Sequence, residues 1–483
     1  MNTLLTRKLM LLLLFLCPLL ANALTCNVRD FGARGDGKNL DSKAINQAIA
    51  KAESQGGGTV VVPAGTYLCG SIRLDDNIEL RLEPGAHIVA TTDKGAYDKS
   101  ETFNGPEYQD GGHTYFHNSL IWADGKKNVA ITGRGSIDGS ALTKKDTEKG
   151  GTLQGGSIGQ ADKAIALKNC RDIAIEGITI FKGGHFGIII TGCERGHIDN
   201  VTIDTNRDGI DIDCCRFISV KGCLVNTPND DALVLKSSYA LQKPVPCENI
   251  TITACTVTGY KLGTLLSGEK IPEKVNWVCG RIKLGTESNG GYRNIAITAC
   301  TMEYSSGLAF EEVDQGRMEN IVVSNIAMNH VHHYPIYITT GCRNRGPKER
   351  TDPSYGGHIA ISNITALDCD SLAGIIVTGM PQQPLRNIAL SNIFIEYRGG
   401  GLPWPDKKVY REQGTNYPEP RWAGPTPAYG LFARHVDGLR LHNIAFCLIK
   451  PDGRQPVVLN DVTHVVADGG TRQLFGAERP QQQ

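Results

Sequence analysis

The stretch Ile175-Glu-Gly-Ile-Thr-Ile and its next copies, Ile198-Asp-Asn-Val-Thr-Ile and Val220-Lys-Gly-Cys-Leu-Val, decide the fold of this chain. Each copy has an apolar residue, a variable residue, and then a small residue or Asn, followed by apolar, variable and apolar positions. The copies begin 23 and 22 residues apart, and the motif recurs as far as Leu441-His-Asn-Ile-Ala-Phe. Period-two alternation indicates half-buried strands, and the Gly, Asn and Asp residues between them indicate tight turns.

A second strand motif lies between these copies and follows the same spacing. It occurs as Gly187-Ile-Ile-Ile, Gly209-Ile-Asp-Ile and Ala232-Leu-Val-Leu, among others. Such short strands cannot each bury an apolar face alone, but they can when they stack as successive coils. An antiparallel sandwich would not repeat one strand motif at constant phase. We therefore predict an all-β protein, a right-handed parallel β-helix, closed at its N-terminal end by a short capping helix that starts after Asp41-Ser42.

The start of the chain has the pattern of a secretion signal. Arg7 and Lys8 precede an apolar run from Leu9 to Leu20, and Ala21-Asn22-Ala23 resembles a cleavage site. We expect residues 1–23 to be a signal peptide, and residues 24–483 to form a single β-helix domain exported to the periplasm or the cell exterior. The apolar run is short for a membrane span, and no later run reaches 18 apolar residues, so we expect no span.

The composition of the chain limits the kinds of molecule and metal that it is expected to bind. The 483 residues carry no net formal charge, which gives no bulk attraction to nucleic acid, and we expect a monomer that binds none. Cys223, Cys255 and Cys300 occupy a repeat position where other copies carry Ile or Val, so we interpret most cysteines as core residues, with one or two disulfides at most. Neither Cys-x-x-Cys nor His/Cys metal-ligand spacing occurs, and we expect no metal and no cofactor.

Two acidic segments open equivalent strands 23 positions apart: Asn206-Arg207-Asp208-Gly209-Ile210-Asp211 and Asn229-Asp230-Asp231-Ala232. If these strands stack, Asp208 lies beside Asp231, with Asp230 at the neighbouring position. Crowded carboxyl groups differ in pKa, because some are raised while others stay ionised. One site can then hold both a general acid and a general base at neutral pH.

Alternate residues of a strand face opposite sides, so the second motif also predicts outward rows. The first row is Asp211, Val234, Lys283, Ala309 and Tyr337, and the next is Asp213, Lys236, Gly285, Glu311 and Thr339. Carboxylates beside Lys236, Arg281 and Lys283 predict a long groove that suits an anionic polymer. For Lys236 the alternative is simple pairing with Asp213 or Glu311 in a surface ladder.

These residues resemble the pectin-degrading glycoside hydrolases of family 28, the polygalacturonase-like β-helices. The resemblance runs from Asp30-Phe-Gly-Ala-Arg-Gly-Asp-Gly-Lys to Tyr429-Gly-Leu-Phe-Ala-Arg-His, nearly the whole mature chain. The family's Asn-Thr-Asp motif is similar to Asn206-Arg207-Asp208, with Arg in place of Thr, and its Asp-Asp motif is similar to Asp230-Asp231. The resemblance implies that Asp230 is the general acid, that Asp208 and Asp231 activate water, and that the anomeric centre is inverted.

Two departures concern the family motifs that recognise the sugar. The family's Gly-His-Gly is replaced by Cys279-Gly280-Arg281, so the histidine is missing. The family's Arg-Ile-Lys, which binds the substrate carboxylate, occurs as Arg281-Ile282-Lys283, but one coil too early. Tyr334-Pro335-Ile336 matches the tyrosine that follows in the family. We expect the aspartates to cut the substrate and the recognition of neighbouring sugars to have changed.

Other candidates for substrate binding are Asn206, Asp211, Lys236, His185 and Arg343. His185 begins a strand one coil before Asp208, and its alternative role is to cap that strand. Arg343, with Arg345 close by, follows a strand of the predicted groove, and its alternative is a surface turn. The long insertions 259–280 and 398–427 are expected to wall off one end of the groove and to favour release of terminal sugars.

The leading hypothesis is therefore a hydrolase of galacturonosyl linkages in pectic polysaccharide or oligosaccharide. The changed carboxylate-binding motifs move the expectation from plain polygalacturonan towards a mixed backbone such as rhamnogalacturonan. One alternative is a polysaccharide lyase on the same scaffold, with a Lys or Arg base and a calcium site formed by the aspartates at 208, 211, 213, 230 and 231. Another is a non-catalytic carbohydrate-binding β-helix, whose binding would survive removal of these aspartates.

Overall fold

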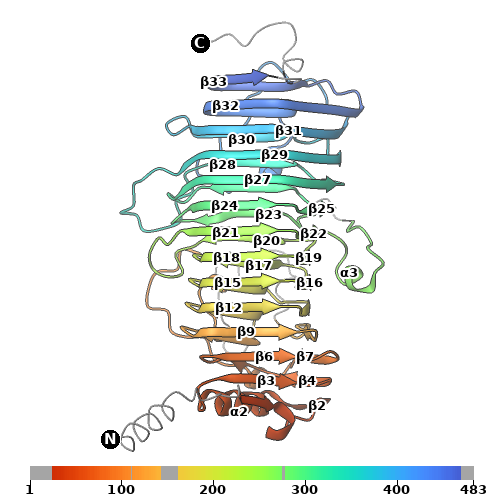
Figure 1. Ribbon diagram of the computed structural model, residues 1–483. Helices are drawn as coiled ribbons and strands as arrows, with labels where there is room; N and C mark the ends of the chain where they lie inside the picture. The colour runs from red at the N-terminus through yellow and green to blue at the C-terminus, as the bar shows by residue number, and fades with distance from the viewer. Residues whose placement is uncertain (1–23, 110, 143–160, 275–277, 469–470, 472–483) are drawn as a thin grey trace, which may run out of the picture.

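The fold is a column of parallel β-coils, seen along its side in Figure 1. The computed structural model describes residues 24–109, 111–142, 161–274, 278–468 and 471. Each strand pairs in parallel with the equivalent strand of the next coil, so the prediction of a right-handed parallel β-helix is confirmed. The predicted signal peptide, 1–23, lies outside the described residues. In the part of the chain that the structure describes, no helix has the length and apolar character needed to cross a membrane.

The strands form three parallel stacks that run along the column. The catalytic-side stack contains β5 (Ile72–Arg73), β8 (Ile121–Asp124), β11 (Lys163–Lys168), β14 (Phe186–Thr191), β17 (Asp208–Asp213), β20 (Leu233–Ser237), β23 (Ile282–Ser288), β26 (Leu308–Glu312), β28 (Ile336–Thr340) and β30 (Ile375–Thr378). The second stack contains β1 (Leu24–Asn27), β3 (Gly58–Val62), β6 (Ile78–Leu82), β9 (Lys127–Gly133), β12 (Arg171–Glu176), β15 (Glu194–Asp199), β18 (Arg216–Lys221), β21 (Cys247–Thr253) and β24 (Tyr292–Thr298).

The third stack contains β2 (Asp36–Leu40), β4 (Gly65–Cys69), β7 (Ala86–Ala90), β10 (Ser136–Asp138), β13 (Thr179–Phe181), β16 (Thr202–Asp204), β19 (Leu224–Asn226), β22 (Thr256–Thr258) and β25 (Thr301–Glu303). Towards the C-terminus, longer strands take part in more than one stack. They are β27 (Arg317–Asn329), β29 (Tyr355–Cys369), β31 (Leu385–Gly399), β32 (Ala428–Lys450) and β33 (Gln455–Asp468). The short helical elements are η1 (Val28–Phe31), α2 (Ser42–Glu53), η2 (Lys94–Ala96), η3 (Gly111–His113), α3 (Thr264–Ser267) and η5 (Pro420–Trp422).

The core runs along the inside of the column and is built from the predicted apolar positions. Ile210, Leu233, Ile282 and Leu308 pair in sequence across four coils, and all four are buried. Burying side chains of this size contributes about 1.5–3 kcal/mol each, so a ladder of them stabilises every coil against its neighbours. The cysteine positions behave in the same way, since Cys255 and its repeat partners are buried and every described cysteine is free.

The predicted capping helix is α2. Its buried face, which includes Ile45 and Ile49, packs against the first coils and closes the open end of the core. Asp41 occupies the N-cap position but does not cap the helix with its side chain. Its carboxylate accepts hydrogen bonds from the backbone N–H groups of Arg34 (2.7 Å) and Gly35 (3.0 Å) instead, and so fixes the preceding turn.

The third position of the first repeat motif has a structural role in the turns. Asn325, Asn363, Asn392 and Asn443 all have φ between 52° and 58°, a left-handed conformation that Asn tolerates better than most residues. Their side-chain amides form a ladder in which each donates to the oxygen of the preceding Asn at 3.0–3.1 Å. The turn therefore requires a small residue or Asn at this position, as the repeat motif shows.

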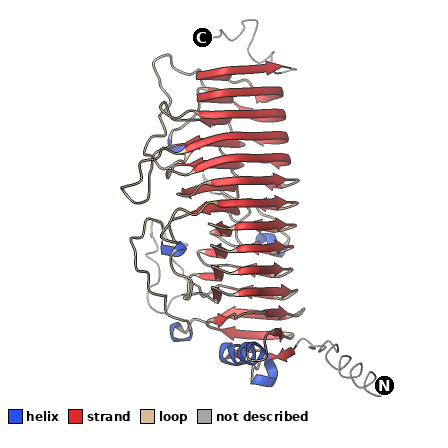
Figure 2. Cartoon of the chain, turned by 60° about the vertical axis from the view of Figure 1, so that its left-hand side comes forward, coloured by secondary structure: helices blue, strands red, loops and turns tan. Residues whose placement is uncertain are grey.

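Two long segments cover the outer face of the catalytic-side stack, and Figure 2 shows the long loops gathered on one side of the column. Between β7 and β8, Phe116 packs against Phe186 and its neighbours on β11 and β14. Between β31 and β32, Tyr410 packs in a cluster with Tyr337. The outward row predicted to line an open groove is therefore buried: Asp211, Val234, Lys283, Ala309 and Tyr337.

Candidate active site

The three aspartates meet where β17 and β20 begin. Ile210 of β17 pairs with Leu233 of β20, which sets the two acidic segments side by side. Asp208 Oδ1 accepts a hydrogen bond from the Asp231 backbone N–H at 3.3 Å. The same N–H group also donates to Asp230 Oδ1 at 3.0 Å, so the carboxyl groups of Asp208 and Asp230 converge on one backbone N–H. The predicted adjacency of these carboxyl groups is thus present in the structure.

Asp231 lies in a buried cationic environment. Its Oδ1 is 2.5 Å from Arg281 Nε and accepts the thiol of Cys279 at 3.3 Å, while its Oδ2 is 3.4 Å from Lys283 Nζ. Burial alone would raise the pKa of this carboxyl group, but the charges of Arg281 and Lys283 outweigh burial and hold the pKa well below its usual range. Asp231 is therefore a fixed anion.

Asp208 and Asp211 share one buried ammonium group. Lys236 Nζ is 3.3 Å from Asp208 Oδ2 and 3.2 Å from Asp211 Oδ2. Burial raises the pKa of Asp211 to about 8, despite Lys236, and burial together with Asp230 raises the pKa of Asp208 well above its usual range. Burial alone would lower the pKa of Lys236, yet the surrounding carboxylates raise it, so the ammonium remains charged and the two carboxyl groups tend to hold protons.

Asp230 faces a different environment from Asp231. Its Oδ2 lies 2.9 Å from Arg207 Nε, and the two side chains are 23% and 30% exposed. Burial would raise the pKa of Asp230, but the Arg207 charge outweighs burial, so the pKa lies below its usual value. Because two adjacent carboxylates repel each other, this pair favours a state with one proton, and the raised pKa of Asp208 and the lowered pKa of Asp230 favour Asp208 as the protonated partner.

Arg281 and Lys283 are placed as the sequence predicted but are not open to solvent. Lys283 pairs with Val234, so the Arg-Ile-Lys segment occupies the coil directly after the Asp-Asp segment. The two residues are 3% and 2% exposed. Arg281 Nη1 donates to Tyr334 Oη at 2.6 Å and to Glu419 Oε2 at 3.2 Å. The segment 400–427 covers these cations, and they hold Asp231 in position.

The other predicted substrate-binding residues are dispersed around the site. Asn206 Oδ1 accepts the side-chain amide of Asn229 at 2.5 Å. His185 is buried, stacks on the ring of Phe186, and has its Nε2 3.3 Å from Arg207 Nη2. Arg343 lies farther along the column, where its guanidinium forms an ion pair with Asp314. Of this group, Asn206 and His185 lie next to the aspartates that were predicted to be catalytic.

The structure adds site residues that the sequence alone did not identify. His113, from the segment that precedes β8, has its Nε2 3.1 Å from Lys236 Nζ. Glu287 Oε2 lies 3.8 Å from the same ammonium group. Glu287 reaches this place because the register of β20 and β23 shifts after Leu235, where the outward row was predicted to continue with Gly285. His113 carried no signal because it lies outside the repeat.

A metal ion has a poor environment at this cluster. Ligand atoms of Asp230, Asp231 and Cys279 lie within 4.8 Å of one another. The Asp231 oxygens, however, already face the guanidinium of Arg281 and the ammonium of Lys283. A cation bound there would be repelled by two buried positive charges, so the donor set does not fit calcium.

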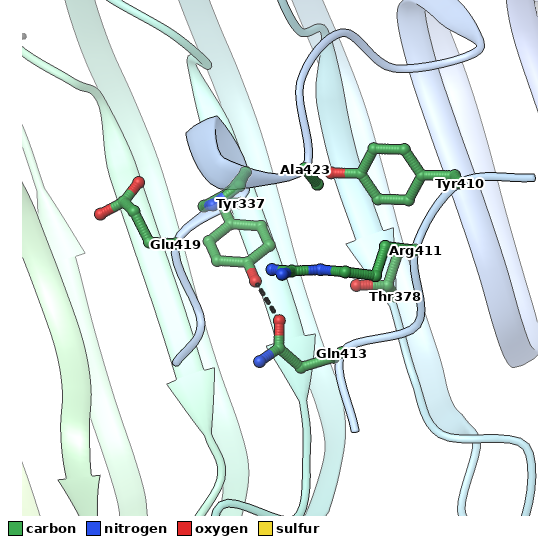
Figure 3. Close-up of a pocket in the computed structure, with 8 residues that line it drawn as sticks. Tyr337, Thr378, Tyr410, Arg411, Gln413, Glu419 and Ala423 are labelled. Carbon is green, nitrogen blue, oxygen red and sulfur yellow. Dashed lines mark hydrogen bonds between the residues drawn. The ribbon is translucent and has the colours of Figure 1, made fainter. Parts of the chain in front are cut away.

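A small pocket lies behind the covered cations, between the segment 400–427 and the outer face of β28 and β30. Tyr337, Arg411, Gln413 and Glu419 are among the residues that line it (Figure 3). Tyr337 Oη donates to Gln413 Oε1 at 3.4 Å. Since Glu419 also contacts Arg281, this segment links the pocket to the Asp231 side of the site.

Known proteins are similar to this chain in sequence and in fold. A family model described as "Rhamnogalacturonase A/epimerase, pectate lyase-like" matches residues 25–261. A probable polygalacturonase from Vitis vinifera is 24% identical over 396 residues, which cover 78% of this chain and 75% of that protein. The chain thus resembles the polygalacturonases in sequence over most of its length.

Solved structures share the fold of this polygalacturonase-like chain. An exopolygalacturonase from Thermotoga maritima has a TM-score of 0.60 at 22% identity and covers 77% of this chain and 87% of its own. A family 28 exopolygalacturonase from Yersinia enterocolitica has a TM-score of 0.65 at 17% identity, covering 92% and 78%. At these identities the likeness concerns the β-helix itself.

Proposed function

We propose that this protein is an inverting glycoside hydrolase that cleaves galacturonosyl linkages in pectic polysaccharide or oligosaccharide. The observation that carries the proposal is the meeting of three carboxyl groups in different environments, with Asp208 beside the partly exposed Asp230, and Asp231 between Arg281 and Lys283. A hydrolase needs one carboxyl group that can give a proton and another that can take one from water. The names of its polygalacturonase relatives support the substrate class.

In the proposed mechanism Asp230 gives a proton to the leaving sugar oxygen, since it is the most exposed of the three carboxyl groups. Asp231 and Asp208 orient a water molecule for attack on the opposite face of the sugar and accept its proton. Arg281 and Lys283 keep Asp231 ionised before the water attacks, so this carboxylate can orient the water and act as a base at neutral pH.

We further propose that the enzyme removes sugars from a chain end. Phe116 covers the outer face of the catalytic-side stack on one side of the aspartates, and Tyr410 covers it on the other. A long polymer that crosses the site would need an uncovered path along this face. A chain end needs to reach only the partly exposed Asp230 and Arg207.

The lyase and binding-protein alternatives have less support. In a lyase of the calcium-dependent kind, the aspartates would surround a metal ion, but here the ammonium of Lys236 lies between Asp208 and Asp211. Asp213 is also engaged, because it accepts hydrogen bonds from the backbone N–H and hydroxyl groups of Ser238. A binding protein would not need the shared proton of Asp208 and Asp230.

The test is a product analysis on defined galacturonate oligosaccharides and on rhamnogalacturonan fragments. We expect new reducing ends without the ultraviolet absorbance of unsaturated products, no dependence on calcium, and a monosaccharide as the first product. Proton NMR of the first product should show inverted configuration. Unsaturated products would support the lyase instead, and a ladder of internal fragments would refute action at the chain end.

We also propose that the protein is exported from the cell. Residues 1–23 are proposed to be removed as a signal peptide, leaving 24–483 as one exported monomeric domain. Amino-terminal sequencing of the secreted protein and its sedimentation behaviour test both points.

A further inference from the structure

The charge of a galacturonate substrate has to be met by an accessible cation. Arg281 and Lys283 are covered, and their charges are balanced by Asp231, Glu419 and Glu311. Burying a further carboxylate beside them would require this network to open, at a cost of several kcal/mol for each separated buried charge. The substrate carboxylate is thus expected to bind elsewhere.

Arg207 has the position and exposure that this role requires. It precedes Asp208 in the chain, about a third of its side chain is exposed, and its Nε lies 2.9 Å from Asp230 Oδ2. Its Nη2 lies 3.3 Å from His185 Nε2, on a ring that is fixed by stacking on Phe186. A guanidinium presents five donors in a planar fork, so it can contact Asp230 and a second carboxylate together.

The pairing with Asp230 also has a consequence for the proton. In the free protein, where Arg207 pairs with Asp230, the arginine charge favours an ionised Asp230 and a protonated Asp208. This is the reverse of the arrangement that a general acid at Asp230 needs. A second carboxylate on Arg207 would offset its positive charge and thereby raise the proton affinity of Asp230.

We propose that Arg207 binds the carboxylate of a galacturonosyl residue next to the scissile bond, and that this binding moves the shared proton from Asp208 to Asp230. The inference rests on the proposed function and deepens it. No proton enters or leaves: the Asp208 O–H bond breaks, the Asp230 O–H bond forms, and Asp208 becomes a carboxylate that can join Asp231 as a base. Hydrolysis then breaks the glycosidic C–O bond and moves the proton from Asp230 to the leaving oxygen. The water oxygen bonds to the anomeric carbon and gives one proton to Asp208, which restores the protonated Asp208 and ionised Asp230 of the free protein.

Arg207 therefore acts as a specificity-determining residue through charge. An anionic sugar sets the site in its active protonation state, and a neutral sugar of the same shape leaves the proton on Asp208. The methyl ester of the galacturonosyl residue is the matched neutral substrate, since it removes the charge and changes little else.

The test compares wild-type protein with Arg207→Gln and Arg207→Thr on a galacturonate oligosaccharide and on its methyl ester. Arg195→Gln is the matched control, because Arg195 on β15 forms a similar, exposed ion pair with Asp172 on β12, in the second stack. We expect wild type and the control to prefer the charged substrate in kcat/KM. The Arg207 variants should lose about tenfold to a hundredfold of that preference, the range for a hydrogen bond to a charged group.

The pH profile separates this role from a purely structural one. Without the Arg207 charge the Asp208–Asp230 pair holds its proton more tightly, so the basic limb of kcat/KM should move to higher pH. Equal losses on both substrates with an unmoved basic limb would overturn the inference.

A binding measurement tests the inference even if the protein turns out not to be a hydrolase. Calorimetry would compare the affinity of the protein for digalacturonate with its affinity for the dimethyl ester. Equal affinity of wild-type protein for the two ligands would overturn the inference, whatever its activity. Charge-dependent binding that Arg207→Gln abolishes, without hydrolysis by wild type, would retain the carboxylate site and refute the hydrolase.

Discussion

The two sides of the catalytic cluster differ although Asp230 and Asp231 are neighbours in the chain. Asp231 is sealed among Arg281, Lys283 and Cys279, and its charge is fixed. Asp230 is partly exposed, pairs with Arg207 and shares a proton with Asp208. The Asp231 side, here called the sealed side, therefore holds a constant charge in the free protein. The Asp230 side, here called the responsive side, can change its protonation when a ligand binds.

The largest effect is expected on the responsive side. Asp230→Asn should fold normally and lose about a hundredfold to ten-thousandfold in kcat, because an amide cannot supply the proton that the leaving oxygen needs. Steady-state kinetics on a galacturonate oligosaccharide measure this loss, with circular dichroism as a check on folding. Activity within tenfold of wild type would contradict the assignment of Asp230 as the acid.

On the sealed side, a substitution should mainly lower the free energy of unfolding of the protein. Lys283→Met removes the ion-pair partner of Glu311 and one of the two cations beside Asp231, and breaking a buried pair costs about 3–5 kcal/mol. Chemical denaturation measures this change, and Lys221→Met, in an exposed pair with Asp199, is the matched control with little expected effect. If Lys283→Met were as stable as the control, the sealed side would not depend on this network.

The buried proton on Asp211 predicts a pH dependence of stability. The pKa of this carboxyl group is about 8 in the folded protein and about 4 in an unfolded chain, so the folded state binds the proton more tightly. Its contribution therefore falls as pH rises from about 4 to about 8. Asp211→Asn, which resembles the protonated form, should gain stability relative to wild type across this window. Parallel stability curves for the two proteins would contradict a raised pKa.

The smallest change in stability is expected in the core of the β-helix, away from the aspartate cluster. Cys255→Val replaces a buried free thiol in the core ladder by an apolar side chain of similar volume, and should cost less than about 1.5 kcal/mol. Thermal unfolding with and without reductant checks this. A large loss confined to non-reducing conditions would mean that the thiol forms a disulfide.

The sequence by itself determined the β-helix and the meeting of the three aspartates. A motif repeated at constant phase, at spacings that begin at 23 and 22 residues and lengthen where loops intervene, fixes which strand pairs with which, because a slip of one residue would turn every apolar side chain outward. Asp208 beside Asp231, and the early coil of Arg281 and Lys283, follow from that register.

Only the tertiary structure decided what covers the site. Glu419 reaches Arg281 across 138 positions of the chain, and His113 reaches Lys236 across 123. Both lie in segments without a repeat, so no periodicity relates them to the strands that they contact. The position of such a segment depends on how its side chains, such as Phe116 and Tyr410, pack on the assembled column. That packing buried the predicted groove and left Arg207 and Asp230 partly exposed, because distant contacts rather than local pattern set the accessibility of a charge.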